Sequence, residues 1–189
     1  GLVRLPSADV LGMLFGLSEL GLSLLKRSGD TARKADRSSL HVVWATVLAS
    51  VALAIVASRR APQWDSALLE HAYGAGVVLF ALGIALRWYS ILHLGRFFTV
   101  DVAIAADHRV VDDGPYRWVR HPSYSGAILA FAGYGLCVGN WLSLALVVVP
   151  VSWAFVRRIE VEEEALTAAL GEAYRAYAAR TRRLVPGIY

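Results

Sequence analysis

Long apolar stretches separated by short charged segments dominate the chain. Residues 40–58 form a run of 19 positions without Asp, Glu, Lys or Arg, and residues 123–156 form a second run of 34. A helix that crosses the hydrocarbon core of a bilayer needs about 20 mostly apolar residues, with roughly 17–25 tolerated. The first run therefore predicts one membrane-spanning helix. The second is too long for one crossing, and Gly139 and Asn140 predict a turn that divides it into two.

Two further stretches are long enough to cross a membrane, although charged residues interrupt them. Asp9 and Glu19 lie in the first stretch, and Glu70 and Arg87 lie near the ends of the other. Long charged side chains near a helix end can reach the membrane surface, so we expect structural polar contacts there. Glu19 lies deepest and is the strongest functional candidate of the four. We predict an all-α integral membrane protein whose five transmembrane helices occupy about residues 6–25, 40–58, 68–92, 122–138 and 141–157.

The positions of the basic residues predict how these helices are oriented. Five Lys or Arg residues lie in segment 26–37, four arginines lie in loop 95–120, and two more follow the last helix. The loops on the opposite side carry only Arg59 and Arg60. Because cytoplasmic loops are enriched in Lys and Arg, we expect the N-terminus outside and the C-terminus in the cytoplasm. No small-residue cleavage site follows the first helix, so we expect that helix to be retained.

The composition narrows the class of protein further. The chain of 189 residues is 57% hydrophobic and 18% charged, and its net charge is +4. No basic helix with interleaved aromatic residues is present, so the positive charge indicates contact with anionic lipid rather than nucleic acid. The one cysteine, Cys137, excludes an internal disulfide and a cysteine-cluster metal site, and we expect no metal. We find no internal repeat and predict a single domain, residues 1–189.

Two polar segments flank the last pair of predicted helices. GPYRWVRHPSYSG (residues 114–126) ends a predicted cytoplasmic loop at 95–120, and RRIEVEEEAL (residues 157–166) opens a predicted C-terminal helix at 158–180. An interfacial helix start is an ordinary meaning of the first segment, and a solvated helix face is an ordinary meaning of the second. However, some of the glutamates share a face with the apolar stripe of that helix. At least one carboxylate is therefore expected to point toward the protein.

The order of these segments resembles one enzyme family. LGRFF (94–98), HRVVDDGPYRWVRHPSYSG (108–126), RRIEVEEEAL (157–166) and LGEAYRAYAARTRRLVPGIY (170–189) are similar to the isoprenylcysteine carboxyl methyltransferase family. This family comprises integral-membrane enzymes that use S-adenosyl-L-methionine and is related to phospholipid methyltransferases. The similarity covers about half of the chain and is closest to small prokaryotic members. It implies a bacterial or archaeal plasma membrane, with the active site facing the cytoplasm.

The resemblance implies a cofactor pocket at the cytoplasmic ends of the last two helices, capped by the C-terminal helix. The residues that would bind S-adenosyl-L-methionine are Val111, Gly114, Tyr116, His121, Pro122, Tyr124, Gly126, Glu163, Leu166 and Tyr174. The acceptor would be a lipophilic small molecule or lipid-modified group that arrives through the bilayer. Arg158 and Arg117 are the candidates for orienting a carboxylate acceptor. Glu162 would take the proton from an amine, thiol or phenol acceptor.

Two other interpretations stay open at this point. Membrane sterol reductases, which are NADPH-dependent oxidoreductases, have a related R-H-x-x-Y-x-G turn. Ala127 stands here where those enzymes typically have Asp, and their paired upstream tryptophans are missing. A non-enzymatic membrane scaffold or transporter would tolerate substitution throughout residues 114–126. The sequence does not distinguish among acceptor classes or oligomeric states.

Overall fold

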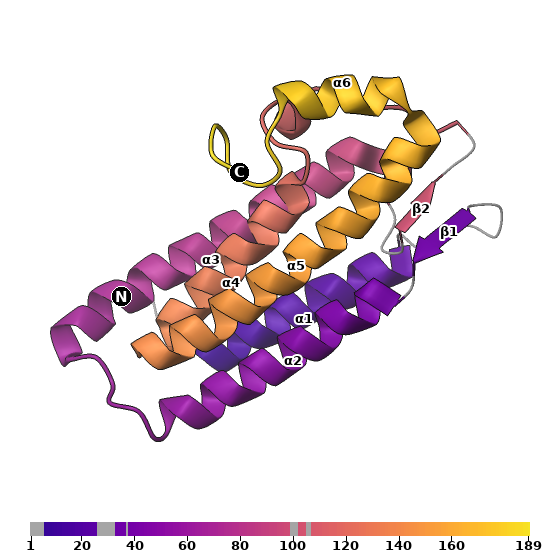
Figure 1. Ribbon diagram of the computed structural model, residues 1–189. Helices are drawn as coiled ribbons and strands as arrows, with labels where there is room; N and C mark the ends of the chain where they lie inside the picture. Colours follow the sequence, from indigo (N-terminus) through magenta and orange to yellow (C-terminus); the bar gives the residue numbers. More distant parts are fainter. Residues whose placement is uncertain (1–5, 26–32, 37, 99–101, 105–106) are drawn as a thin grey trace.

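The apolar stretches correspond to five long helices that lie side by side in one bundle (Figure 1). The computed structural model describes residues 6–25, 33–36, 38–98, 102–104 and 107–189. The five long helices are α1 (Ala8–Leu25), α2 (Ser38–Ser58), α3 (Ser66–Leu94), α4 (Pro122–Val138) and α5 (Trp141–Leu170). Their starts follow ordinary capping rules: the Asp65 carboxylate accepts the Leu68 N–H, and the Asn140 side chain accepts the Ser143 N–H.

Three helical segments among the described residues are long and apolar enough to cross a membrane: Ser39–Ser58, Ala67–Phe97 and Trp141–Leu170. At 17 residues, α4 is the shortest of the five, and it packs between α3 and α5 with ten of its residues buried. The crossing of all five helices and their orientation remain predictions. Within the basic segment 26–37, residues 26–32 and 37 lie outside the described part of the chain.

The region after α3 and the end of α5 differ from the predicted elements. β1 (Arg33–Asp36) and β2 (Val102–Ile104) form an antiparallel ribbon, so the fold is not purely helical. The short 3-10 helices η1 (Gly95–Phe97) and η2 (Gly114–Arg117) also lie in loop 95–120. The predicted helix 158–180 is divided. The first part continues α5, Gly171 ends it with φ of 57°, and α6 (Glu172–Arg180) turns away across the bundle end (Figure 1).

Glycines let α3 and α4 approach until their backbones touch. Gly83 lies opposite Gly126, and Gly76 lies opposite Gly133. A Cβ atom on Gly126 would lie 2.6 Å from the backbone oxygen of Gly83, and one on Gly133 would lie 2.4 Å from that of Gly76. Small residues at such crossings are typical of helices that pack in lipid. Gly126, which the resemblance assigns to the cofactor site, therefore faces α3 instead.

Replacing Gly126 with alanine is expected to destabilise the bundle by about 1–3 kcal/mol, because the added methyl group has no space between the two backbones. Unfolding in mixed detergent micelles measures the effect. Gly74→Ala is the matched control, since no atom lies within 4 Å of the position that its Cβ would occupy. Equal unfolding of the two variants would contradict the close contact.

Candidate active site

A cavity opens between loop 107–117, the start of α4, the end of α5 and α6. It encloses about 790 Å³, counting its open mouth. The predicted site residues that line it are Val111, Tyr116, His121, Tyr124, Arg158, Glu162, Leu166 and Tyr174.

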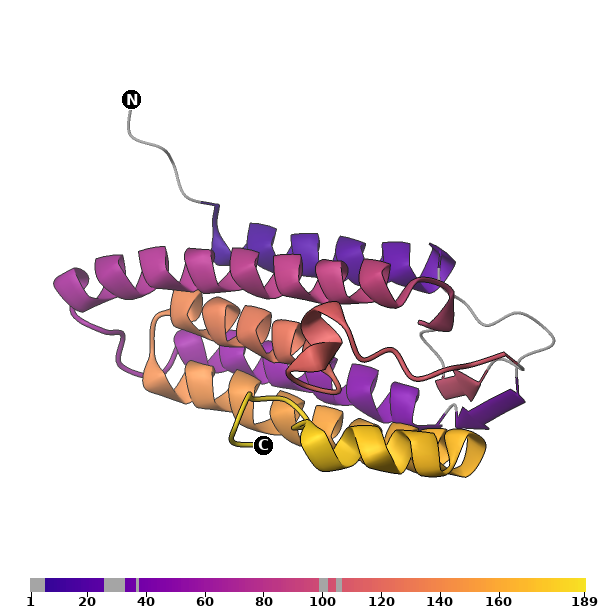
Figure 2. The ribbon, with the colours of Figure 1, turned by 90° about the horizontal axis from the view of Figure 1, so that it is seen from above.

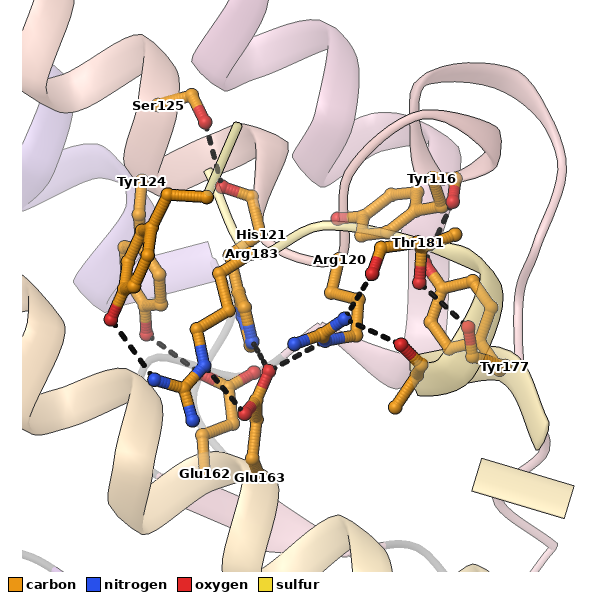
Figure 3. Close-up of polar contacts among 12 residues, drawn as sticks. Tyr116, Arg120, His121, Tyr124, Ser125, Glu162, Glu163, Tyr177, Thr181 and Arg183 are labelled. Carbon is orange, nitrogen blue, oxygen red and sulfur yellow. Dashed lines mark hydrogen bonds and ion pairs between the residues drawn. The ribbon is translucent and has the colours of Figure 1, made fainter. Parts of the chain in front are cut away.

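Glu163 is the polar centre beside this cavity (Figure 3). Its Oε1 accepts from Arg120 Nε at 2.7 Å and lies 3.1 Å from His121 Nε2, while its Oε2 accepts from Arg183 Nε at 3.0 Å. The Glu163 side chain is 13% exposed and does not line the cavity. Both of its oxygens are therefore engaged by side chains of the protein itself, and its place is behind the cavity wall.

The segment after α6 holds the start of α4 through the backbone. The Arg120 N–H donates to the Arg182 carbonyl at 2.7 Å, and the His121 N–H donates to the Arg183 carbonyl at 3.0 Å. Val119 and Arg182 form a parallel bridge. Pro122 is fully buried at the first position of α4, where its missing N–H costs nothing. The R-H-P sequence is thus fixed from two sides, by Glu163 and by residues 182–183.

A second polar group links α4 to α5 inside the cavity. The Tyr124 hydroxyl donates to Glu162 Oε2 at 2.9 Å and accepts from Arg158 Nε at 3.2 Å. Arg158 Nη1 also donates to Ser39 Oγ at 2.6 Å, and the residue is 3% exposed. A permanently charged guanidinium, a hydroxyl and a carboxylate therefore converge where the cavity reaches the bundle.

Aromatic residues form the opposite wall. The Tyr116 hydroxyl donates to the Ser90 carbonyl at 3.2 Å, and the Tyr177 hydroxyl donates to the Tyr116 carbonyl at 2.7 Å. Burial raises the pKa of Tyr116, Tyr174 and Tyr177, so all three stay neutral at physiological pH. The Tyr174 hydroxyl is buried and has no hydrogen-bond partner among the described residues.

His108 and Phe97 belong to the same wall but were not among the predicted site residues. Their ring centroids are 4.9 Å apart, and both residues line the cavity. The His108 Nδ1 is buried without a partner in the described part of the chain, and burial lowers the pKa of this histidine. His108 opens the segment that resembles the family, so that segment was the available signal for it.

Two other predicted residues lie outside the cavity. Arg117 is exposed, and its guanidinium lies 5.2 Å from the Trp118 ring centroid. It therefore does not line the cavity with Arg158. Gly114 has φ of 53°, and a Cβ there would lie 2.6 Å from the His93 ring. The neighbouring Asp113 places its Oδ1 2.8 Å from His93 Nε2, and this hydrogen bond lowers the pKa of Asp113. Gly114 therefore shapes the loop turn.

Comparison with known proteins shows which family this arrangement resembles. Residues 76–168, from the middle of α3 almost to the end of α5, match the model of the isoprenylcysteine carboxyl methyltransferase family. These residues include the whole glycine contact between α3 and α4, and both glutamates of the site. These residues are therefore similar to the isoprenylcysteine carboxyl methyltransferase family.

Relatives extend the family match. Protein-S-isoprenylcysteine O-methyltransferase B of Arabidopsis thaliana is 35% identical over 113 residues, which cover 59% of this chain and 57% of the plant protein. Protein-S-isoprenylcysteine O-methyltransferase of Schizosaccharomyces pombe is 36% identical over 107 residues, which cover 56% of this chain and 44% of the yeast protein. The chain thus spans about half the length of these relatives.

A solved structure supports the same assignment. The eukaryotic intramembrane Ras methyltransferase of this family superposes with a TM-score of 0.63 at 27% identity. The match covers 77% of this chain and 52% of the other. The helical bundle is therefore the fold of this family, and the matched region extends well beyond residues 76–168.

Proposed function

We propose that this protein transfers a methyl group from S-adenosyl-L-methionine to a lipophilic acceptor within the membrane. In this proposal all five long helices cross the bilayer, and the cavity faces the cytoplasm. The observation that carries it is the cavity at the R-H-P sequence, built from the segments that match the methyltransferase family. The plant and yeast relatives are named as isoprenylcysteine O-methyltransferases, and we extend only the reaction class to this chain.

The residues around the cavity fit the chemistry of this methyl donor. S-adenosyl-L-methionine supplies an activated methyl group on a sulfonium and also carries an adenine, a ribose and an amino-acid end. Neutral aromatic rings such as those of Tyr116 and Tyr174 suit the adenine and the cation. The unpaired hydroxyl of Tyr174 and the carboxylate of Glu162 are available to polar groups of the donor. Positioning and exclusion of water are the contributions expected from such a site.

Two further cavities provide a path for the acceptor. An apolar groove of about 800 Å³ lies between α1 and α2 and is lined by residues such as Gly12, Val47 and Leu48. A middle cavity of about 520 Å³ shares Val47 with this groove and shares Tyr124 and Arg158 with the first cavity. An acceptor with a hydrocarbon tail would therefore lie with its tail in the groove and its polar end at Arg158.

Arg158 favours an acidic acceptor group. A carboxylate needs no base before it attacks a methyl group, but it does need to be held in line with the donor. A buried guanidinium presents paired donors for this purpose. Tyr124 holds the Nε edge of Arg158, and Ser39 holds Nη1, so the group is fixed before the acceptor arrives.

Arg158→Met is expected to lower kcat/KM for a lipophilic carboxylate acceptor by about 100-fold, because the orienting charge is lost. The measurement is transfer of labelled methyl groups to an S-farnesyl-cysteine derivative in lipid nanodiscs. Arg157→Met is the matched control, since its side chain is adjacent but 64% exposed. Retention of S-adenosylhomocysteine binding in Arg158→Met, measured by calorimetry, shows that the variant is folded.

Calorimetric titration also tests the reaction class itself. The wild-type protein is expected to bind S-adenosylhomocysteine with micromolar affinity and not to bind NADPH. Binding of NADPH alone would replace the proposal with a reductase. Folded protein that binds neither compound would leave no support for an enzyme of either kind.

A further inference from the structure

The segment after α6 forms a closed hook that exposes apolar side chains. Residues 182–189, called the hook below, turn back so that the Leu184 and Val185 N–H groups both donate to the Tyr189 carbonyl at 2.6 Å. Ile188 is 79% exposed, Val185 is 45% exposed and Tyr189 is 42% exposed. The hydrogen bonds fix the loop conformation, so these side chains stay on the outside. An ordered apolar surface of this kind indicates a contact.

The depth of the hook along the bundle follows from its contacts with α4. Ser125 Oγ donates to the Leu184 carbonyl at 2.6 Å, so the hook lies beside the first turn of α4. Gly126 of that turn touches Gly83 of α3. Gly83 lies well inside the apolar segment Ala67–Phe97, and the adjacent Leu82 is 55% exposed. Figure 2 shows the chain folding back from α6 over the bundle to reach this level. The hook is therefore level with a surface that is expected to face lipid.

The surroundings of the hook carry aromatic and basic side chains. Trp118 is 60% exposed and lies one residue from the Val119–Arg182 bridge. Arg182 of the bridge and Arg117, two residues before Val119, are both exposed. Apolar residues flanked by Trp, Tyr and Arg are the composition of a protein surface at the boundary between hydrocarbon and lipid head groups. Arginines there attract anionic head groups.

We propose that the hook is a membrane anchor that inserts into the interfacial region of the leaflet at the start of α4. Val185 and Ile188 contact acyl chains, while Arg117 and Arg182 contact phosphate groups of the lipids. The partner is the bilayer itself rather than a protein or a diffusible ligand. The anchor goes beyond methyl transfer and needs only that α3 and α4 lie in the membrane.

The anchor also connects the bilayer to the site. Arg183, within the hook, donates to Glu163 through its side chain and accepts from His121 through its carbonyl. Contact of the hook with lipid would therefore also stabilise the position of the R-H-P sequence. A protein extracted from lipid is expected to lose order at His121 before the bundle unfolds.

Spin labels in lipid nanodiscs locate the hook directly. Ile188→Cys, labelled with a nitroxide in a Cys137→Ala background, is expected to be more accessible to oxygen than to a water-soluble nickel complex. Glu172→Cys on α6 is the matched control, because its side chain is 84% exposed and should show the reverse order. Equal accessibility patterns at the two positions would overturn the anchor.

A proteolysis experiment without a spin label tests the same proposal, because the label itself could disturb the hook. Ile188→Asp is expected to raise the rate of trypsin cleavage after Arg182 and Arg183 by about tenfold in nanodiscs, because cleavage tracks the population of the released segment. Ile188→Leu, which keeps an apolar side chain, should be cleaved at the wild-type rate. If Ile188→Asp and wild type are cleaved at the same rate in nanodiscs, the hook is not held by lipid. Neither readout depends on methyl transfer, so failure here would leave the proposed function standing.

Discussion

Arg87→Met is expected to destabilise the protein by about 3–5 kcal/mol, because it leaves the Glu19 carboxylate buried without its partner. Arg87 binds Glu19 through two parallel hydrogen bonds, Nε to Oε1 at 2.6 Å and Nη2 to Oε2 at 2.7 Å. The two side chains are only 8% and 10% exposed. Arg87 Nη1 also donates to the Ser123 carbonyl at 3.3 Å. One guanidinium thus ties α1 to α3 and to the start of α4.

Replacing both charges distinguishes a lost pair from lost packing. Glu19→Leu combined with Arg87→Met removes both buried charges, and its stability is expected to lie within about 1 kcal/mol of wild type. The free energy of unfolding in mixed micelles gives the comparison. The exposed pair Arg157–Glu160 provides the control, since its side chains are 64% and 43% exposed and its removal should change stability by less than about 1 kcal/mol. A double variant as unstable as Arg87→Met alone would show that packing, not charge, is responsible.

The same pair is also expected to affect substrate access. Glu19 and Arg87 line the middle cavity between the apolar groove and Arg158. A further hydrogen bond joins α1 to α3, in which Trp88 Nε1 donates to Ser18 Oγ at 2.7 Å. The groove between α1 and α2 is thus fixed on its α1 side by contacts with α3. Loss of the pair should therefore broaden the range of acceptors that the double variant methylates, since that variant keeps the fold.

The positions of the helices could be predicted because bilayer thickness sets the length of an apolar segment. The family relationship could be predicted because the R-H-P and E-E segments occur in a fixed order, and the family match confirms it. Rotation of each helix about its axis could not be predicted. Glu19 was recognised as the deepest of the four charges and Arg87 as a charge near a helix end, but only the structure shows that they meet. Gly126 was assigned to a pocket that it does not face, because small residues serve helix crossings and ligand sites alike.

The end of the chain shows a second limit of sequence reasoning. A glycine inside an amphipathic pattern is compatible with a continuous helix, so Gly171 gave no clear sign that α6 would leave the axis of α5. That turn is what brings Arg183 to Glu163, 20 residues earlier in the chain. The carboxylate that was expected to point toward the protein does so, but it meets two arginines and a histidine of the chain. Such a meeting depends on tertiary contacts among α4, α5 and residues 182–183.

Glu163→Ala is expected to lower kcat/KM for methyl transfer by about 100-fold or more, although Glu163 does not line the cavity. Its removal takes away the carboxylate partner of Arg120, which keeps its hydrogen bonds to the Ala178 and Thr181 carbonyls. It also leaves His121 Nε2 without its contact. The Arg120 and His121 side chains are only 11% and 4% exposed. Loss of one partner from a buried ionic group costs about 3–5 kcal/mol. The R-H-P sequence would have to shift so that the Arg120 charge reaches water, and a rise of about 1.4 kcal/mol in the activation free energy already lowers the rate tenfold.

Two variants separate positioning from a direct contact with the donor. Glu164→Ala is the matched control, because the neighbouring glutamate is exposed and should have little effect. Arg183→Ala removes one partner that is 31% exposed and leaves the Arg120 and His121 contacts, so a loss of about tenfold is expected. A positioning role requires that both Glu163→Ala and Arg183→Ala speed trypsin cleavage within residues 182–189, since both release the same segment. If Glu163→Ala abolished S-adenosylhomocysteine binding while cleavage stayed at the wild-type rate, Glu163 would instead contact the donor. The arrangement of Arg120, His121 and Arg183 around its two oxygens supports the positioning role.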